Sequence, residues 1–323
     1  MPPVTQIPEP LSSTTGHANI IRMSEAIVGP VVPARASTVI LIRDTDGQLQ
    51  VYLLKRSSRS SFMPGNYVFP GGAVDPEDIG LDFWKDNVDM DPGQIKRRFG
   101  RGLNIDDAMA HGIAAVRETF EEACLFLADN TGRAGNDLEK LKGTQLNGIL
   151  PGDWLRHLVL SGAWTVKLSA LAPWSHWITP KIRSKRYDTR FFAAFMPEGK
   201  ECRPDNRETT HGIWVSPEKA LRGNLKGEIP LSPPTVTTLN EFLQYSSAGV
   251  LKKELEARSW GEERIPRLVP MTGGPLLLLP WDPQYHDQEI KVEIRGLGKR
   301  AAPLGRPFSR LWYSEGVWRP INP

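Results

Sequence analysis

Residues 68–127 contain a glycine-rich turn and, later in the segment, a predicted helix with three glutamates on one side. No other feature of the sequence constrains the fold as much. Glu118, Glu121 and Glu122 are spaced i, i+3 and i+4, so on a helix they fall within roughly 100° of one another. Like charges at this spacing repel, and an isolated helix gains nothing from them. Either something compensates for the repulsion, or the acidic stripe faces solvent.

The opposite side of the same predicted helix is apolar. It carries Ile113, Val116, Phe120, Ala123, Cys124 and Leu127. A helix with one apolar and one charged side buries the first and presents the second. We expect Asn104 or Asp106 to cap its amino end, and we expect the helix to stop near the turn formers of residues 129–132.

The acidic stripe has two interpretations. A divalent cation such as Mg²⁺ takes oxygen ligands and is usually held by a few carboxylates together with substrate phosphates. A solvated acidic face is the alternative, because acidic residues three and four apart are frequent on exposed helices. The preceding segment favours the cation. Gly71 and Gly72 follow an apolar strand and Pro70, and small residues there let the backbone turn sharply and expose its amides and carbonyls to a ligand.

The turn, the arginine beside the first glutamate and the final glutamate pair together resemble the signature of the Nudix hydrolases, Gly-x5-Glu-x7-Arg-Glu-U-x-Glu-Glu-x-Gly-U, where U is apolar. The matching residues are Gly72, Arg117, Glu118, Glu121, Glu122 and Leu125. The resemblance implies that Gly72 and the three glutamates hold Mg²⁺ or Mn²⁺ and that Arg117 orients the carboxylates. It also makes Glu118 and Glu121 the candidates to accept the proton of the attacking water.

The chain departs from this signature at several positions. Cys124 replaces the late glycine, Thr119 occupies an apolar position, and Asp78 stands where the motif has its first glutamate. The largest departure is a segment of 38 residues, 79–116, between Asp78 and Arg117, where the compact motif has a much shorter spacer. We expect Cys124 to be a small core residue within the helix rather than a reactive thiol.

One branch of the Nudix hydrolases, related to the peroxisomal coenzyme A diphosphatases, resembles the chain on both sides of this insertion. Residues 69–78 read Phe-Pro-Gly-Gly-x-x-Asp-x-x-Asp, and residues 117–123 read Arg-Glu-Thr-Phe-Glu-Glu-Ala as in that branch. Further similar segments contain Trp174, Asp188 and Trp214 and extend the resemblance to roughly residues 36–245. The implied fold is α/β, a Nudix α/β/α sandwich with a mixed central sheet and helical cap insertions.

The resemblance also implies a reaction, the divalent-metal-dependent hydrolysis of a diphosphate linkage in a nucleoside diphosphate derivative. Coenzyme A or an acyl-coenzyme A is the favoured substrate, and a dinucleotide or a nucleotide sugar is the alternative. A third interpretation is a non-catalytic Nudix-fold module that binds a nucleotide or a protein. The presence of all three glutamates argues against such a module.

Several residues outside the motif are candidates to bind substrate. Guanidinium groups pair bidentately with phosphate oxygens, so Arg56 and Arg59 could clamp a diphosphate, with a solvated loop as the alternative. Glu208 is a candidate for the additional carboxylate that many Nudix enzymes draw from beyond the motif; a polar loop residue is the alternative. We expect aromatic residues of the two cap insertions to line a channel for an extended apolar arm of the substrate.

The overall composition is that of an ordinary soluble protein, with 40% hydrophobic and 24% charged residues. A net charge of +3 is small for 323 residues, and we expect no nucleic-acid partner. Two cysteines provide no disulfide framework, no apolar run approaches a membrane span, and the amino terminus lacks the blocks of a signal peptide. We therefore expect a cytoplasmic protein without a membrane partner, as a monomer or a homodimer, that acts on a small molecule.

We divide the chain into a loose N-terminal arm, 1–35, a Nudix domain, 36–245, and a C-terminal extension, 246–323, packed on the Nudix domain. The cap insertions lie near residues 79–110 and 134–172.

Periodicity and turn signals predict the elements within these parts. The expected strands of the central sheet are 36–43, 51–56, 174–179, 190–196 and 212–216. The expected helices are 153–160, 217–221, 234–246 and 251–258. The C-terminal extension is predicted to be β-rich, with strands over 274–279, 289–295 and 309–318.

Overall fold

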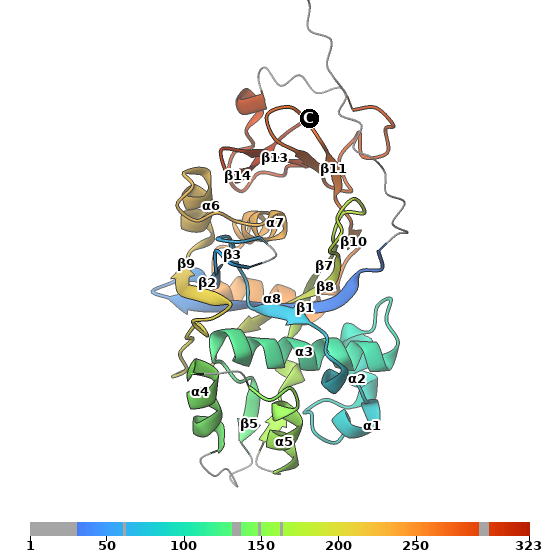
Figure 1. The fold of residues 1–323 in the computed structure, drawn as a ribbon, viewed down its shortest axis with the longest axis vertical. Coiled ribbons are helices and arrows are strands. Elements are labelled where there is room, and N and C mark those ends of the chain that lie inside the picture. Colours follow the sequence, from blue (N-terminus) through green and yellow to red (C-terminus); the bar gives the residue numbers. More distant parts are fainter. Residues whose placement is uncertain (1–30, 61–62, 131–136, 148–149, 162–163, 291–296) are drawn as a thin grey trace, which may run out of the picture.

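The computed structural model describes residues 31–60, 63–130, 137–147, 150–161, 164–290 and 297–323 (Figure 1). Its central strands are β1 (Ala34–Thr45), β2 (Gln48–Arg56), β3 (Tyr67–Val68), β4 (Gly71–Ala73), β7 (Ala172–Ile178), β8 (Tyr187–Phe195), β9 (Thr209–Val215) and β10 (Glu263–Arg264). They form one mixed sheet in the order β10-β7-β8-β1-β2-β3, in which β4 also pairs with β1 and β9 with β2. β1 is antiparallel to β2 and parallel to β8.

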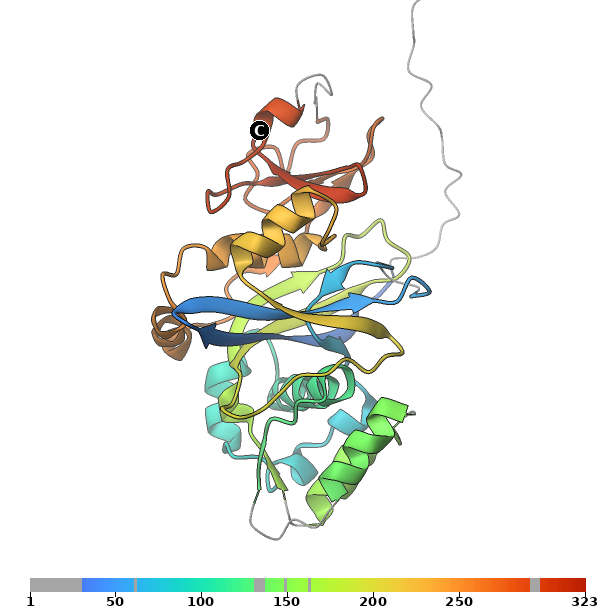
Figure 2. The same cartoon turned by 90° about the vertical axis from the view of Figure 1, so that its left-hand side faces the viewer.

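Helices cover both faces of this sheet (Figures 1 and 2). On one face lies α3 (Ile105–Ala123), and on the other lie α6 (Pro217–Leu225) and α7 (Pro233–Phe242). A further helix, α8 (Ala248–Ala257), packs beside β7. This arrangement confirms the predicted α/β/α sandwich with a mixed central sheet.

The sequence of β1 explains why it lies at the centre. Val39, Ile40, Leu41 and Ile42 form a continuous apolar run, and all four are fully buried. Successive side chains of a strand point to opposite faces, so a continuous run is the signature of a strand that is covered on both sides. Val39 and Leu41 join the apolar cluster that contains the buried face of α3, whereas Ile40 and Ile42 join the cluster that contains α6 and α7.

The cap insertions lie below α3 in Figure 1 and beside its ends. The first contains η1 (Pro76–Asp78), α1 (Leu81–Trp84) and α2 (Pro92–Phe99). The second contains β5 (Ala128–Asn130), α4 (Asp137–Asn147), α5 (Trp154–Leu160), β6 (Trp164–Val166) and η2 (Leu168–Ala170). Both are therefore mainly helical, as predicted, and α5 occupies the predicted segment.

The ends of α3 test the helix prediction in detail. Asn104 caps the start, because its side chain accepts a hydrogen bond from the Asp107 backbone N–H at 2.8 Å. The predicted end near residues 129–132 is wrong: the helix stops at Ala123. Cys124 takes a left-handed conformation with φ of +56°, the conformation for which helix ends favour glycine. Cys124 thus adopts, at the end of the helix, the left-handed conformation for which the motif has a glycine.

The C-terminal extension forms a second sheet, which lies beyond α6 and α7 in Figure 2. Within the extension, α8 packs against the central sheet and β10 joins it, and the remaining elements are β11 (Arg267–Val269), β12 (Leu276–Leu278), η3 (Leu297–Arg300), β13 (Arg310–Ser314) and β14 (Val317–Ile321). The strand order is β11-β12-β13-β14, all antiparallel. The strand predicted over 309–318 is split into β13 and β14 by a turn at Glu315 and Gly316, both of which have positive φ. Leu277, Leu311 and Trp318 belong to the same apolar cluster as Ile40, so the two sheets share one core.

Two sequence predictions fall wholly or partly outside the described residues. They concern the N-terminal arm up to residue 30 and most of the strand expected over 289–295. In the part of the chain that the structure describes, no helix has both the length and the apolar composition needed to cross a bilayer.

Candidate active site

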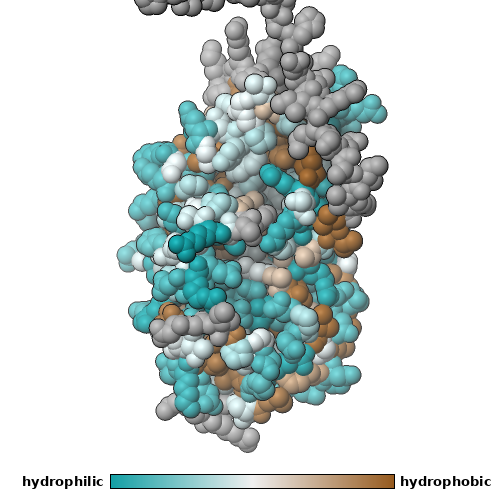
Figure 3. Space-filling view, viewed as in Figure 1, coloured by the Kyte–Doolittle hydropathy of each residue, from teal (hydrophilic) through white to brown (hydrophobic). Residues whose placement is uncertain are grey.

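A cavity of about 1370 Å³ lies against the glycine turn and the acidic side of α3, and it extends to the C-terminal sheet. Every site residue predicted from the sequence lines it: Arg56, Arg59, Gly72, Arg117, Glu118, Glu121, Glu122 and Glu208. The structure therefore brings together residues that are far apart in the sequence, from Arg56 at the end of β2 to Glu208 just before β9. On the molecular face in Figure 3, hydrophobic residues recur mainly along the right-hand side, the side on which Figure 1 shows β10 and β11.

The glycine turn approaches the acidic helix more closely than other residues could. Gly71 has φ of +154°, and its N–H donates to Glu122 Oε2 at 2.9 Å. A Cβ added to Gly72 would lie 2.4 to 2.7 Å from the carboxylate atoms of Glu118. Real Cβ contacts are essentially never that short, so a glycine here is what allows the Glu118 carboxylate to reach the turn.

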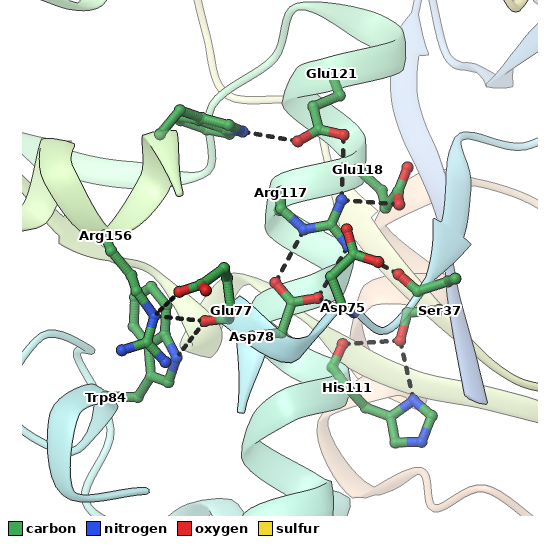
Figure 4. Close-up of polar contacts among 12 residues, drawn as sticks. Ser37, Asp75, Glu77, Asp78, Trp84, His111, Arg117, Glu118, Glu121 and Arg156 are labelled. Atoms are coloured by element: carbon green, nitrogen blue, oxygen red, sulfur yellow. Dashed lines mark hydrogen bonds and ion pairs between the residues drawn. The ribbon is translucent and has the colours of Figure 1, made fainter. Parts of the chain in front are cut away.

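Arg117 is the hub that positions the carboxylates (Figure 4). Its Nε and Nη2 each donate to Asp78 at 2.9 Å, forming a bidentate pair in which both side chains are almost fully buried. Its Nη1 donates to Glu118 Oε1 at 2.9 Å and to Glu121 Oε2 at 3.1 Å. Nη2 also donates to the Ala73 carbonyl at 2.8 Å. Arg117 is therefore a positioning residue whose guanidinium is fully occupied by protein groups.

Burial dominates the electrostatics of the glutamates. It raises the pKa of Glu118 well above the usual value, against the opposing charge of Arg117, and it raises the pKa of Glu121 in the same way. Burial also raises the pKa of Glu122, which the Gly71 N–H and the charge of Arg56 only partly offset. Carboxylates with raised pKa values gain most when a cation enters the site, because burial penalises the unpaired charge.

The three glutamates are not equivalent. Both oxygens of Glu121 accept hydrogen bonds, Oε2 from Arg117 and Oε1 from Trp154 Nε1 at 2.7 Å. Glu118 Oε1 and Glu122 Oε2 are similarly occupied, but among the described residues no hydrogen bond reaches Glu118 Oε2 or Glu122 Oε1. Glu118 and Glu122 therefore flank the glycine turn with one oxygen each to offer.

The donor chemistry fits a hard divalent cation that is shared between the protein and a substrate. Within the described ranges, no three His, Cys, Asp or Glu side chains form a group that could hold a metal ion by themselves. Mg²⁺ is usually bound by one or two carboxylates plus substrate phosphates rather than by a closed protein cage. Glu118 and Glu122 supply such carboxylates, and Glu121, whose two oxygens each accept one hydrogen bond, is a further donor.

The predicted substrate-binding residues lie at the same end of the cavity. Arg56 Nε donates to Ser60 Oγ at 3.1 Å, and the Arg56 charge acts on Glu122. Arg59 is exposed and lines the cavity. The charge of Glu208 also acts on Glu122, and the Glu208 carbonyl accepts from the Ser57 N–H at 2.8 Å. The positive charges of Arg56 and Arg59 suit contacts to a phosphate group, whereas Glu208 adds a further carboxylate to the cavity.

Sequence reasoning did not assign roles to Asp78, Trp154 or Asp205. The spacing of Asp78 from Gly72 was a signal, because it matches the first glutamate of the motif. Trp154 gave no signal, since 33 residues separate it from Glu121. Asp205 is buried and accepts from Thr209 Oγ1 at 2.7 Å and from the Glu208 N–H at 3.0 Å, which fixes the loop that carries Glu208.

The prediction that cap aromatics line a substrate channel is wrong for the described residues. Trp84 and Phe99 of the first cap are fully buried in the apolar core under α3. The cavity takes only Gln145, Leu150 and Gly152 from the described part of the second cap. The cap aromatics were needed to fill the space below α3, and the C-terminal sheet supplies the cavity wall instead.

Comparisons with known proteins agree on one family. Residues 31–242 match the description NUDT19 Nudix domain. The acyl-coenzyme A diphosphatase NUDT19 of Gallus gallus is 30% identical over 279 residues, which cover 73% of this chain and 72% of that protein. The protein of the same name from Homo sapiens is 28% identical over 300 residues, with 81% and 80% covered.

A solved structure shows the same fold. The crystal structure of a NUDIX hydrolase from Alicyclobacillus acidocaldarius superposes with a TM-score of 0.56 at 24% identity. The match covers 72% of this chain and 99% of that one.

Proposed function

We propose a function from one established premise: the chain belongs to the Nudix hydrolase family, in the group described as the NUDT19 Nudix domain, and is a Nudix diphosphatase. We propose that it hydrolyses the diphosphate linkage of coenzyme A or an acyl-coenzyme A. The products would be 3′,5′-adenosine diphosphate and 4′-phosphopantetheine, or the acylated form of the latter. Relatives named acyl-coenzyme A diphosphatases support this choice of substrate.

The observation that carries the proposal is the pair formed by Glu118 and Glu122 at the glycine turn. Both are largely buried, both have raised pKa values, and each has an oxygen to which no described residue donates. A solvated acidic face would show none of these properties. Burying an unpaired carboxylate destabilises a protein, and such groups cluster at functional sites.

The protein residues divide the work. Glu118 and Glu122, with Glu121 and the Gly72 carbonyl as further donors, would hold Mg²⁺ or Mn²⁺. When bound, the cation would lower the pKa of the attacking water and offset the negative charge of the phosphate oxygens. Arg117, anchored by Asp78, keeps the carboxylates in place.

Water attack breaks the bond between one phosphorus and the bridging oxygen. Arg56 and Arg59 would orient the diphosphate through charge-assisted hydrogen bonds. Either Glu118 or Glu121 would accept the proton of the water. Each Glu121 oxygen already accepts one hydrogen bond, whereas Glu118 Oε2 accepts none from a described residue, so Glu118 has more free lone pairs to offer the water.

A product analysis tests the proposal. The protein is incubated with Mg²⁺ or Mn²⁺ and, separately, with coenzyme A, an acyl-coenzyme A, NADH, adenosine diphosphoribose and a dinucleoside polyphosphate, in ¹⁸O-water. We expect the coenzyme A derivatives to be cleaved best, and the product that carries ¹⁸O identifies the phosphorus attacked. Cleavage of the other compounds while all coenzyme A derivatives stay intact would overturn the substrate.

The same proposal can be tested against a non-catalytic module. Two results together would indicate such a module. The protein would turn over none of the compounds, and electron paramagnetic resonance would show that it binds Mn²⁺ no more strongly than a variant with Glu118, Glu121 and Glu122 changed to Gln.

A further inference from the structure

The cavity has two ends of opposite character. At one end lie the glutamates, the glycine turn and the arginines of the proposed reaction. At the other end a wall comes from the C-terminal sheet and its connections, and the residues it contributes are apolar or aromatic: Pro266, Leu268, Pro275, Leu277, Tyr313 and Trp318. The connection between β7 and β8 adds the polar residues Arg183, Ser184 and Lys185 to the cavity lining. A substrate that fills this cavity would need a charged head and an apolar continuation.

The register of the C-terminal sheet explains this wall. Leu268 lies opposite Leu277 across β11 and β12, and Tyr313 lies opposite Trp318 across β13 and β14. Residues directly opposite share a face, and residues two apart along a strand do so too, so these four side chains belong to one face with Leu311. The other face carries Leu276 and Leu278, which pack into a separate cluster with Leu297 and Ile321.

The cavity face is apolar and braced. Leu277 and Trp318 are mostly buried, whereas Tyr313 is 38% exposed, and the Tyr313 and Trp318 rings lie 5.1 Å apart. Pro266 and Pro275 have no backbone N–H. The residues of the C-terminal sheet thus offer mainly aliphatic and aromatic surface to the cavity, which suits a hydrocarbon chain.

The size of the cavity agrees with such an occupant. Its volume of about 1370 Å³ exceeds the range of roughly 300 to 1,000 Å³ that is usual for small-molecule sites. A nucleoside diphosphate head at the glutamates would therefore leave room toward the C-terminal sheet.

We infer that the inner face of the C-terminal sheet, Leu268, Leu277, Tyr313 and Trp318, is a binding site for an apolar acyl chain attached to the diphosphate substrate. This inference rests on the proposed function and adds to it the residues that contact the acyl chain. The C-terminal extension then acts as a specificity element of the active site: longer acyl chains contact this wall, and free coenzyme A does not.

The test compares kcat/KM for free coenzyme A, acetyl-coenzyme A and a medium-chain acyl-coenzyme A. Two variants change the wall: Tyr313→Ser removes apolar surface at the most exposed position, and Leu268→Trp fills space. Val250→Ser, at an exposed apolar residue of α8 outside the cavity, is the matched control. Each variant is first checked for the wild-type melting temperature and circular dichroism spectrum.

We expect the wild-type kcat/KM to rise from free coenzyme A to the medium-chain derivative. For each wall variant, the ratio of kcat/KM for the medium-chain derivative to kcat/KM for free coenzyme A should fall about tenfold or more. Small changes of an apolar pocket act on this scale. Val250→Ser should keep the wild-type ratio. An unchanged ratio in both folded wall variants overturns the inference but leaves the proposed function intact. Equal losses on all three substrates also overturn it, because they indicate that the wall binds the shared nucleotide part. No cleavage of any coenzyme A derivative removes the proposed function and the inference together.

Discussion

The buried pair between Asp78 and Arg117 is expected to hold the whole site together, and Asp78→Asn tests this. The substitution keeps the size of the side chain but removes its charge and places an N–H₂ group near the guanidinium. Asp78 and Arg117 are 1% and 3% exposed. Breaking a buried ion pair by removing one partner costs about 3 to 5 kcal/mol.

The structure places the expected cost at the lower end of that range. Arg117 keeps hydrogen bonds to Glu118, Glu121 and the Ala73 carbonyl after the substitution, so its charge does not become unpaired. A loss of about 3 kcal/mol lowers the melting temperature by roughly 4 °C in a chain of 323 residues. Activity should fall about 10- to 100-fold, as is usual when a group that orients metal-binding side chains is removed.

Thermal unfolding and steady-state hydrolysis measure the two effects. Asp82→Asn is the matched control, because Asp82 lies in the same cap insertion and forms an ion pair with Lys85, but its side chain is 98% exposed. Surface pairs of this kind contribute little, so this variant should unfold at the wild-type temperature. The reasoning is refuted if Asp78→Asn unfolds at the same temperature as Asp82→Asn.

Three other predictions follow from individual residues. Because Cys124 already has a left-handed backbone, Cys124→Gly should shift the free energy of unfolding by less than about 1 kcal/mol. Valine is β-branched, so Cys124→Val should lower the melting temperature clearly. A large loss of stability in Cys124→Gly would contradict the backbone assignment. Gly72→Ala should reduce kcat at least about 100-fold, because the new Cβ displaces the Glu118 carboxylate. Gly249→Ala, where a Cβ meets only Ser247 Oγ at 3.8 Å, should retain the wild-type kcat. Equal kcat values in the two variants would disprove the close approach of Gly72 to Glu118. Burial raises the pKa of Glu122 to about 8, so between the usual glutamate pKa of about 4.3 and that value the folded metal-free protein binds more protons than the unfolded chain. Glu122 should therefore make the free energy of unfolding fall as pH rises through this window. Urea unfolding should show this slope weakened in Glu122→Gln, and identical slopes would argue against the raised pKa.

The sequence determined much of the fold because its signals were local. The apolar run from Val39 to Ile42 predicts a central strand, and the spacing of Glu118, Glu121 and Glu122 predicts one acidic side of a helix. These patterns depend only on the periods of strands and helices. The structure confirms both elements and places all three glutamates on the same cavity.

The features that sequence reasoning missed depend on contacts between distant segments. Nothing local distinguishes Trp154, which reaches Glu121 from the second cap, from the other tryptophans that fill the core. The end of α3 was misplaced because Cys124 reads as an apolar helix residue, and only its backbone angle shows that it ends the helix. β12 reads Leu-Leu-Leu, so its sequence does not show which of its two faces closes the cavity.

The most direct test of the account compares hydrolysis of an acyl-coenzyme A by Glu122→Gln and by Glu256→Gln. Glutamine at position 122 keeps the side chain's size and an oxygen that can accept from the Gly71 N–H, and it removes the charge that the site would use to hold a divalent cation. Glu256 is an exposed glutamate of α8 and controls for the loss of one charge. The account predicts that, with Mg²⁺ at saturation, kcat falls at least about 100-fold in Glu122→Gln and stays at the wild-type value in Glu256→Gln. Wild-type kcat in a folded Glu122→Gln protein would contradict the claim that the buried carboxylates of α3 carry the reaction.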